Sequence, residues 1–306
     1  MKAKNSLAKS RNTLQREKYR TGLLFILPSL ILCGMFMVWP LIEVFRYSLT
    51  DWNGINVEYK YIGLENYRKI AKIDGFNSMM IGTITYALGV TVLTILISFI
   101  AALALDKKGR GRLPRGMMRS LWFLPALLSG TVVGLLWRVM FNYKNGVINK
   151  FITSVGGVAI KWLEGKGWAN LAIIIGSTWV QIGLCVIVFL AGLQAIPQDL
   201  YEAAELDGAS PWQRLRHITL PMMASSITIN VITTTIAGFK AYELPYNITQ
   251  GQPSKTTLLM TQRIQFFGMQ DCDYGLGSAL AVFLLAIIAA ISLIQLVYLK
   301  KREDIY

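Results

Sequence analysis

Six long runs of apolar residues, separated by shorter polar stretches, dominate the pattern along the 306-residue chain. Each run is close to the roughly 20 apolar residues that cross the hydrocarbon core of a bilayer. Because backbone groups in lipid must satisfy their own hydrogen bonds, each run is expected to be a helix. The pattern therefore predicts an all-α, polytopic membrane protein with six transmembrane helices. The predicted helices lie at about residues 21–43, 78–105, 120–141, 169–190, 223–245 and 277–299.

The distribution of positive charge predicts the orientation of these helices. Of the 31 Lys and Arg residues, 18 fall in the two termini and the loops that alternate with them, and 11 fall in the opposite loops. The positive-inside rule therefore places both termini in the cytoplasm. The densest cluster, in the loop Asp106–Arg119, fits a topology determinant that contacts anionic lipid headgroups. The net charge of +14 thus requires no nucleic-acid partner.

The chain is expected to form one membrane domain, residues 21–299, between a basic N-terminal segment, 1–20, and a C-terminal tail, 300–306. Its composition agrees, with 54% hydrophobic residues, 16% charged residues and a mean hydropathy of +0.45. The first apolar run continues past 20 residues without a small-x-small cleavage site, so it is expected to be a membrane helix and not a signal peptide. The three cysteines and the single histidine show no metal-ligand spacing.

The fifth run is the most polar of the six. Ser226, Asn230 and Thr233 or Thr234 recur at helical spacing and share one face. Such a face is unfavourable in lipid, so it is expected to contact either neighbouring helices or a hydrophilic path that exchanges hydrogen bonds with a solute. The polar face continues outward to Tyr242 and Glu243. The third run contains Gly130-x-x-x-Gly134, a spacing that lets two helices approach closely.

The segment 191–222, on the cytoplasmic side, has clear helix signals. Pro197 suits the start of a short helix, whose first turn carries acidic residues. Gly208 suits a left-handed C-terminal cap, and Ser210-Pro211 suits the start of a second helix. The segment is either a solvated loop or an element that docks into a partner's groove, with Glu202 paired to an arginine.

The residues of this segment match a known signature. Glu202-Ala203-Ala204, Gly208, Ile218 and Leu220-Pro221 stand at the spacing of the EAA motif of ABC-importer permeases. Four flanking sequences are also present: Gly63-Leu-Glu-Asn-Tyr67, Trp122-Phe-Leu-Pro125, Tyr242-Glu-Leu-Pro-Tyr246 and Thr249-x-Gly251-x-Pro253. They resemble those of carbohydrate-uptake permeases of the maltose, raffinose and glycerol-phosphate type. One difference is Gln252, which stands where that family often has the second glycine of Thr-x-Gly-Gly-Pro.

The resemblance implies the type I ABC importer permease fold and a location in the bacterial cytoplasmic membrane. It implies a second, related permease, two ATP-binding subunits and an extracytoplasmic solute-binding protein as partners. This chain has no Gly-x4-Gly-Lys-Ser/Thr loop, so ATP and Mg would be used by the partner ATPase, and this chain would be no enzyme and bind no cofactor. The EAA residues would couple to the ATPase. Gly208→Pro and Glu202→Lys are expected to abolish ATPase docking but not membrane insertion.

Other functions remain open at this stage. An ABC permease could carry glycerol-3-phosphate or another non-sugar solute. An ion-gradient carrier would need ionisable residues near the bilayer centre, and the predicted helices have them only near their ends. A membrane-embedded enzyme would need a metal cluster or a nucleophile–base pair, and the sequence shows neither.

Overall fold

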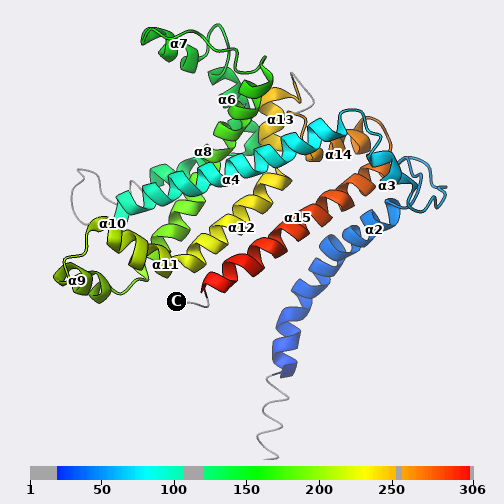
Figure 1. Ribbon diagram of the computed structural model, residues 1–306. Helices are drawn as coiled ribbons and strands as arrows, with labels where there is room; N and C mark the ends of the chain where they lie inside the picture. Colours follow the sequence, from blue (N-terminus) through cyan, green and yellow to red (C-terminus); the bar gives the residue numbers. More distant parts are fainter. Residues whose placement is uncertain (1–18, 107–119, 253–256, 304–306) are drawn as a thin grey trace, which may run out of the picture.

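The computed structural model describes residues 19–106, 120–252 and 257–303, which form helices joined by short loops (Figure 1). Within this part of the chain, Thr50 and Tyr61 form an isolated antiparallel bridge. The basic loop residues 107–119, both ends of the chain and Pro253 lie outside the described residues. The elements are η1 (Gly34–Val38), α2 (Trp39–Tyr47), α3 (Glu65–Ile70), α4 (Phe76–Asp106), η2 (Leu124–Leu127), α6 (Gly130–Met140), α7 (Val147–Ser154), α8 (Lys166–Gln194), α9 (Gln198–Leu206), α10 (Pro211–Arg214), η3 (Leu215–Thr219), α11 (Leu220–Met222), α12 (Ala224–Lys240), α13 (Glu243–Thr249), α14 (Met260–Met269) and α15 (Tyr274–Glu303).

Within the described residues, four helices are long and apolar enough to cross a bilayer. They are Tyr19–Tyr47, Phe76–Asp106, Gly167–Gln194 and Tyr274–Lys301. At about 1.5 Å per residue each is roughly 40 Å long or more, which exceeds the hydrocarbon thickness of about 30 Å. They match the predicted first, second, fourth and sixth helices, and two bent helix pairs occupy the places of the third and fifth. The chain is therefore a helical, multi-pass membrane protein.

The third predicted helix, 120–141, is not straight. Residues Ser120–Leu127 and Gly130–Met140 meet at 103°. Pro125 lacks the N–H of a helical ladder and crowds the carbonyl four residues before it, which ends the first helix in the 3₁₀ turn η2. Ser129 then caps α6, accepting a hydrogen bond from the Val132 amide (3.3 Å). The prediction of one continuous helix here was wrong.

The fifth predicted helix, 223–245, was also wrong in its limits. It starts after a bend of 67° between Pro211–Met222 and Ala224–Lys240, so Leu220-Pro221 precedes the bend. It ends at Lys240, because Pro245 would crowd the carbonyl of Ala241 and could not donate to it. Ala241 is extended instead, and Pro245 sits in the first turn of the new helix α13.

Proline also explains the two π-helical segments. Gly34–Val38 ends two residues before Pro40, and Leu215–Thr219 ends two residues before Pro221. The missing proline N–H removes one hydrogen bond from the α-helical ladder, and the turn before it widens to i→i+5. Accordingly, the amide that follows each segment bonds to the carbonyl of the segment's first residue, Gly34 or Leu215.

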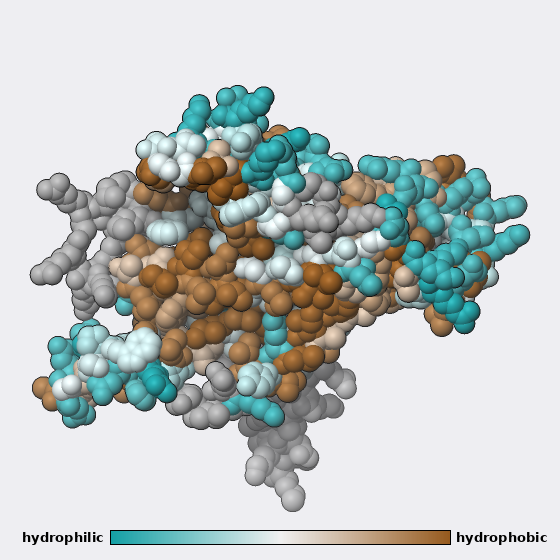
Figure 2. Space-filling view, turned by 45° about the horizontal axis from the view of Figure 1, so that its top comes forward, coloured by the Kyte–Doolittle hydropathy of each residue, from teal (hydrophilic) through white to brown (hydrophobic). Residues whose placement is uncertain are grey.

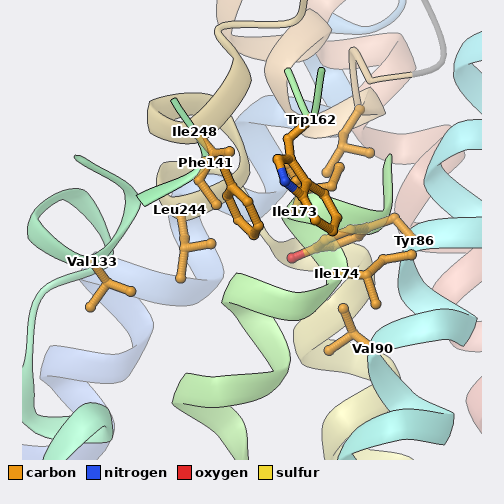
Figure 3. Packing of buried hydrophobic residues seen from close by; sticks show 11 residues of the cluster. Tyr86, Val90, Val133, Phe141, Trp162, Ile173, Ile174, Leu244 and Ile248 are labelled. Atoms are coloured by element: carbon orange, nitrogen blue, oxygen red, sulfur yellow. The ribbon is translucent and has the colours of Figure 1, made fainter. Parts of the chain in front are cut away.

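The core lies where α4, α8 and α12 pack together, with α15 beside α12. Small residues let these helices approach: a Cβ on Gly238 of α12 would lie 3.0 Å from Ala87 Cα of α4. At the end nearer α6 and α13, one cluster joins Tyr86 of α4 to Ile173 of α8 and to Phe141 and Trp162 of the loops (Figure 3). A second cluster at the other end holds Phe189, Leu193, Ile196 and Met223.

The first long helix diverges from this bundle (Figure 1). In its most apolar 18-residue window no residue is buried, although α2 contacts α15. Apolar side chains are also exposed on the rest of the molecule, where Figure 2 shows them as a broad band between hydrophilic ends. Side chains such as Phe25 and Phe36, 81% and 71% exposed, would be unfavourable in water and suit a lipid or protein environment.

Candidate functional site

The segment 191–222, called here the EAA segment, lies at one end of the bundle, beside the ends of α4 and α8 and opposite α3 and α14 (Figure 1). The predicted short helix, glycine turn and second helix are all present, as α9, Gly208 and α10. Gly208 has φ +74°. Its amide bonds to Glu205 O (3.1 Å), and the Ala209 amide bonds to Ala204 O (2.9 Å). These two bonds form the Schellman motif that a C-terminal glycine allows.

The second helix starts as its sequence indicates. Ser210 and Gln213 form a reciprocal capping box, and Pro211 occupies the first helical position. The chain continues through the π-helical η3 to α11, and Met223 then marks the bend into α12. The EAA segment is therefore a preformed pair of helices.

The EAA residues divide into two groups. Glu202, Ala203 and Gly208 are exposed and Ala204 is half-buried, whereas Ile218, Leu220 and Pro221 are half-buried in the connection to α12. Glu202 accepts a hydrogen bond from Gln198 Nε2 (2.8 Å) of the same helix. Helix α9 buries none of its residues. The first group can therefore reach a partner, and the second joins it to the bundle.

A cavity of about 940 Å³ opens beneath α9. Across it, two contacts join α9 to the helix that follows Gly208. Tyr201 Oη lies 2.9 Å from Thr219 Oγ1, and Arg214 Nη1 lies 3.2 Å from Glu205 Oε2. The sequence analysis did not single out these four residues. The opposite charges of Glu205 and Arg214, on either side of the turn at Gly208, could have indicated the ion pair. The walls of the cavity are the ends of α4 and α8, together with α9, α10 and η3.

The polar residues of the predicted path have different surroundings. Asn230 is 2% exposed and donates to Cys185 O of α8 (3.2 Å). Thr234 is buried and donates to Asn230 O of its own helix, whereas Thr233 is exposed and Ser226 half-buried. The burial of Asn230 and Thr234 favours contact with neighbouring helices for these two side chains.

Tyr242 and Glu243 lie at the other end of α12, where α13 begins. Tyr242 stacks on Tyr246, with ring centroids 5.6 Å apart and an angle of 10° between the planes. Partial burial, followed by the neighbouring Tyr246 and Glu243, raises the pKa of Tyr242, so its phenol stays a neutral donor. Glu243 is exposed beside Gly130, where a Cβ would lie 3.1 Å from its Oε2. The predicted glycine spacing thus serves the close contact between α6 and α13.

A metal site is not found in the described part of the chain, where no three or more His, Cys, Asp or Glu side chains group together. The side chains that the EAA segment exposes, the Glu202 carboxylate and the small Ala203, suit recognition of a partner surface.

The sequence of residues 94–304 matches the family described as binding-protein-dependent transport system inner membrane component. The chain belongs to this family. The permease is 31% identical, over 92% of its length and 94% of the relative's, to the probable starch degradation products transport system permease protein of Thermoanaerobacterium thermosulfurigenes. It is 29% identical to the trehalose/maltose transport system permease protein of Thermococcus litoralis, over 96% of this chain and 99% of that one.

Solved structures show the same fold. The permease resembles a chain of a bacterial ABC transporter involved in the import of the acidic polysaccharide alginate, with a TM-score of 0.78 and 21% identity over 94% of this chain and 98% of that one. It also resembles a chain of the bacterial alginate ABC transporter in complex with an alginate pentasaccharide-bound periplasmic protein, with a TM-score of 0.80 and 22% identity over 92% and 95%. The fold is therefore that of an ABC-importer permease.

Proposed function

We propose that this permease is a membrane-spanning subunit of an ATP-driven sugar importer of the bacterial cytoplasmic membrane. The observation that carries the proposal is the preformed EAA helix pair, with Glu202 and Ala203 exposed at one end of a family permease. The sugar class rests on relatives named for starch degradation products, for trehalose and maltose, and for multiple sugars.

We propose six membrane crossings, with each bent helix pair counted as one crossing. The excess of Lys and Arg in the termini and in the loops on their side supports a cytoplasmic location for both termini and α9. The opposite end, with α3, α7 and α14, faces outward toward a solute-binding protein. Residues 21–299 form the membrane domain in this arrangement, flanked by the segments 1–20 and 300–306.

Energy enters through partner chains. We propose that two ATPase subunits bind ATP and Mg, and that one of them holds α9 through Glu202, Ala203, Ala204 and the turn at Gly208. When the ATPase pair closes, it moves α9, and Ile218, Leu220 and Pro221 carry this movement to α12. The bundle, together with a second, related permease, would then change from an inward-facing to an outward-facing state.

The sugar path is proposed along the exposed side of α12. Thr233 is exposed on this helix, and Tyr242 and Glu243 lie near its outer end. Ser226 is half-buried at the edge of the path, where its hydroxyl packs beside Gly192 of α8. Hydroxyl, phenol and carboxylate groups can exchange hydrogen bonds with sugar hydroxyls. Asn230 would support this helix from its packed side through its bond to Cys185 O, and Thr234 is buried and bonds within its own helix.

Transport by the complete complex in sealed vesicles tests this function. Uptake of maltose, raffinose and sn-glycerol-3-phosphate is measured with the matching binding protein, with and without ATP inside. The proposal predicts ATP-dependent uptake of a sugar, and loss of both uptake and ATPase co-purification in Glu202→Lys. Uptake that persists without ATP and follows an ion gradient would refute it. ATP-dependent uptake of sn-glycerol-3-phosphate alone would replace the sugar with that solute.

A further inference from the structure

Helix α9 lies on the surface, at one end of the bundle (Figure 1). It buries none of its residues, and the cavity of about 940 Å³ separates it from the ends of α4 and α8. A helix moved by a partner transmits force through the chain at its two ends and through the contacts that it makes with the body. Those contacts are therefore candidates for residues that determine how tightly ATP hydrolysis is coupled to transport.

Tyr201 is the residue of α9 that reaches the core. Its ring packs against the second cluster of the core, which contains Leu193, Ile196 and Met223. Its hydroxyl pairs with that of Thr219, which is 4% exposed and lies in η3. Because η3 leads directly through α11 to the bend at Met223, this bond connects α9 to the base of α12.

Glu205 and Arg214 form the second contact, one helical turn farther along α9. The pair spans the glycine turn and joins α9 to α10 at 3.2 Å. Arg214 is 26% exposed and Glu205 is 74% exposed, so solvent screens the attraction. The ion pair therefore orients the two helices, whereas the less exposed tyrosine–threonine bond resists their separation.

We infer that Tyr201, Thr219, Glu205 and Arg214 form a latch across the turn at Gly208, which keeps α9 at a fixed angle to the base of α12 and makes ATPase movement drive transport. They are positioning residues, distinct from the exposed residues that the ATPase would contact. This inference rests on the proposed function, because it requires an ATPase bound to α9.

Tyr201→Phe, Thr219→Val and the double variant test the hydrogen bond. In the reconstituted complex, the sugar transported per ATP hydrolysed is compared with the amount of ATPase that co-purifies. Loss of one hydrogen bond of about 1 kcal/mol shifts the latched equilibrium by about fivefold. We expect transport per ATP to fall by up to that factor in each variant, with the ATPase still bound, and the double variant to be no worse than either single variant.

Tyr67→Phe is the matched control. Tyr67 Oη lies 2.8 Å from Ser48 Oγ in the outer loop, so this variant loses a similar bond at the opposite end. Transport per ATP should remain unchanged in it. For the ion pair, Glu205→Arg and Arg214→Glu should each lower transport per ATP, and the two together should restore it.

The results separate the latch from the proposed function. Unchanged transport per ATP in Tyr201→Phe would overturn the latch, and loss of the ATPase from that complex would do so as well, by assigning the bond to docking. If the latch alone is wrong, Glu202→Lys still abolishes ATPase binding. If the proposed function is wrong, Glu202→Lys leaves both ATPase binding and transport intact.

Discussion

Substitution of Gly208 probes the shape of the EAA segment without adding a steric clash. The residue has φ +74°, and a Cβ built on it meets no atom within 4 Å. Any effect of Gly208→Ala therefore comes from backbone strain alone. The left-handed region costs an L-residue roughly 1–2 kcal/mol, and less for asparagine, whose side chain can bond locally. Proline cannot adopt this φ, and it also loses the amide bond to Glu205 O.

These costs predict a graded series. Transport and ATPase co-purification should fall in the order Gly208, Gly208→Asn, Gly208→Ala, Gly208→Pro. A cost of about 1–2 kcal/mol in Gly208→Ala reduces the population of the correct turn by roughly 5-fold to 30-fold relative to the alternatives. Gly208→Pro should abolish docking, and all three variants should still insert into the membrane. The assay is sugar uptake in vesicles, together with the amount of ATPase retained on the purified permease.

Gly156 provides the matched control. It has φ +85°, and a Cβ on it also meets no atom within 4 Å, but it lies in the loop after α7 at the opposite end. Gly156→Ala pays the same backbone cost and should leave ATPase binding unchanged. Equal ATPase binding in Gly208→Ala, Gly208→Pro and the unchanged chain would refute the argument that the left-handed turn shapes the docking element.

Three further substitutions test the packing. Asn149→Ala removes four hydrogen bonds, with Tyr143, Ile160 and Trp162. It should destabilise its loop by about 2–3 kcal/mol, which would appear as faster amide hydrogen exchange in that loop. Asn145→Ala, at an exposed position nearby, should leave the exchange unchanged. Gly183→Ala places a Cβ against the Trp122 carbonyl and 2.9 Å from Phe123 Cα. This overpacking should cost about 1–3 kcal/mol and lower the Tm. Gly34→Ala, whose Cβ meets open space, should not lower it. Asn66→Ala leaves the carbonyls of Ser48 and Thr50 without its amide and should lower Tm, and an unchanged Tm would contradict that role.

Local backbone signals predicted the EAA segment well. Pro197, Gly208 and Ser210-Pro211 act within a turn of their own position, so their effect needs no knowledge of neighbouring helices. Hydropathy likewise located the four long helices, because the bilayer imposes the length of an apolar run.

The broken helices were not predicted, although their cause is visible in the sequence. Hydropathy measures the transfer of side chains and does not register the missing N–H of Pro125 or Pro245. The neighbours of the polar face of α12 could not be predicted for a different reason. Helical spacing places Asn230 and Thr234 on one face, but only the packing against α8 shows what covers Asn230. Residues 107–119, which carry six of the 18 Lys and Arg residues on the predicted cytoplasmic side, lie outside the described structure.

Crosslinking from Ala203 tests the central claim most directly. A cysteine is placed at this exposed position after Cys33, Cys185 and Cys272 are replaced by serine, and the complete complex is treated with a short bifunctional thiol reagent. The account predicts a crosslink between Ala203→Cys and the ATPase, together with protection of this cysteine from a membrane-impermeant reagent added outside intact cells. Labelling from outside, or a crosslink that never reaches the ATPase, would contradict it.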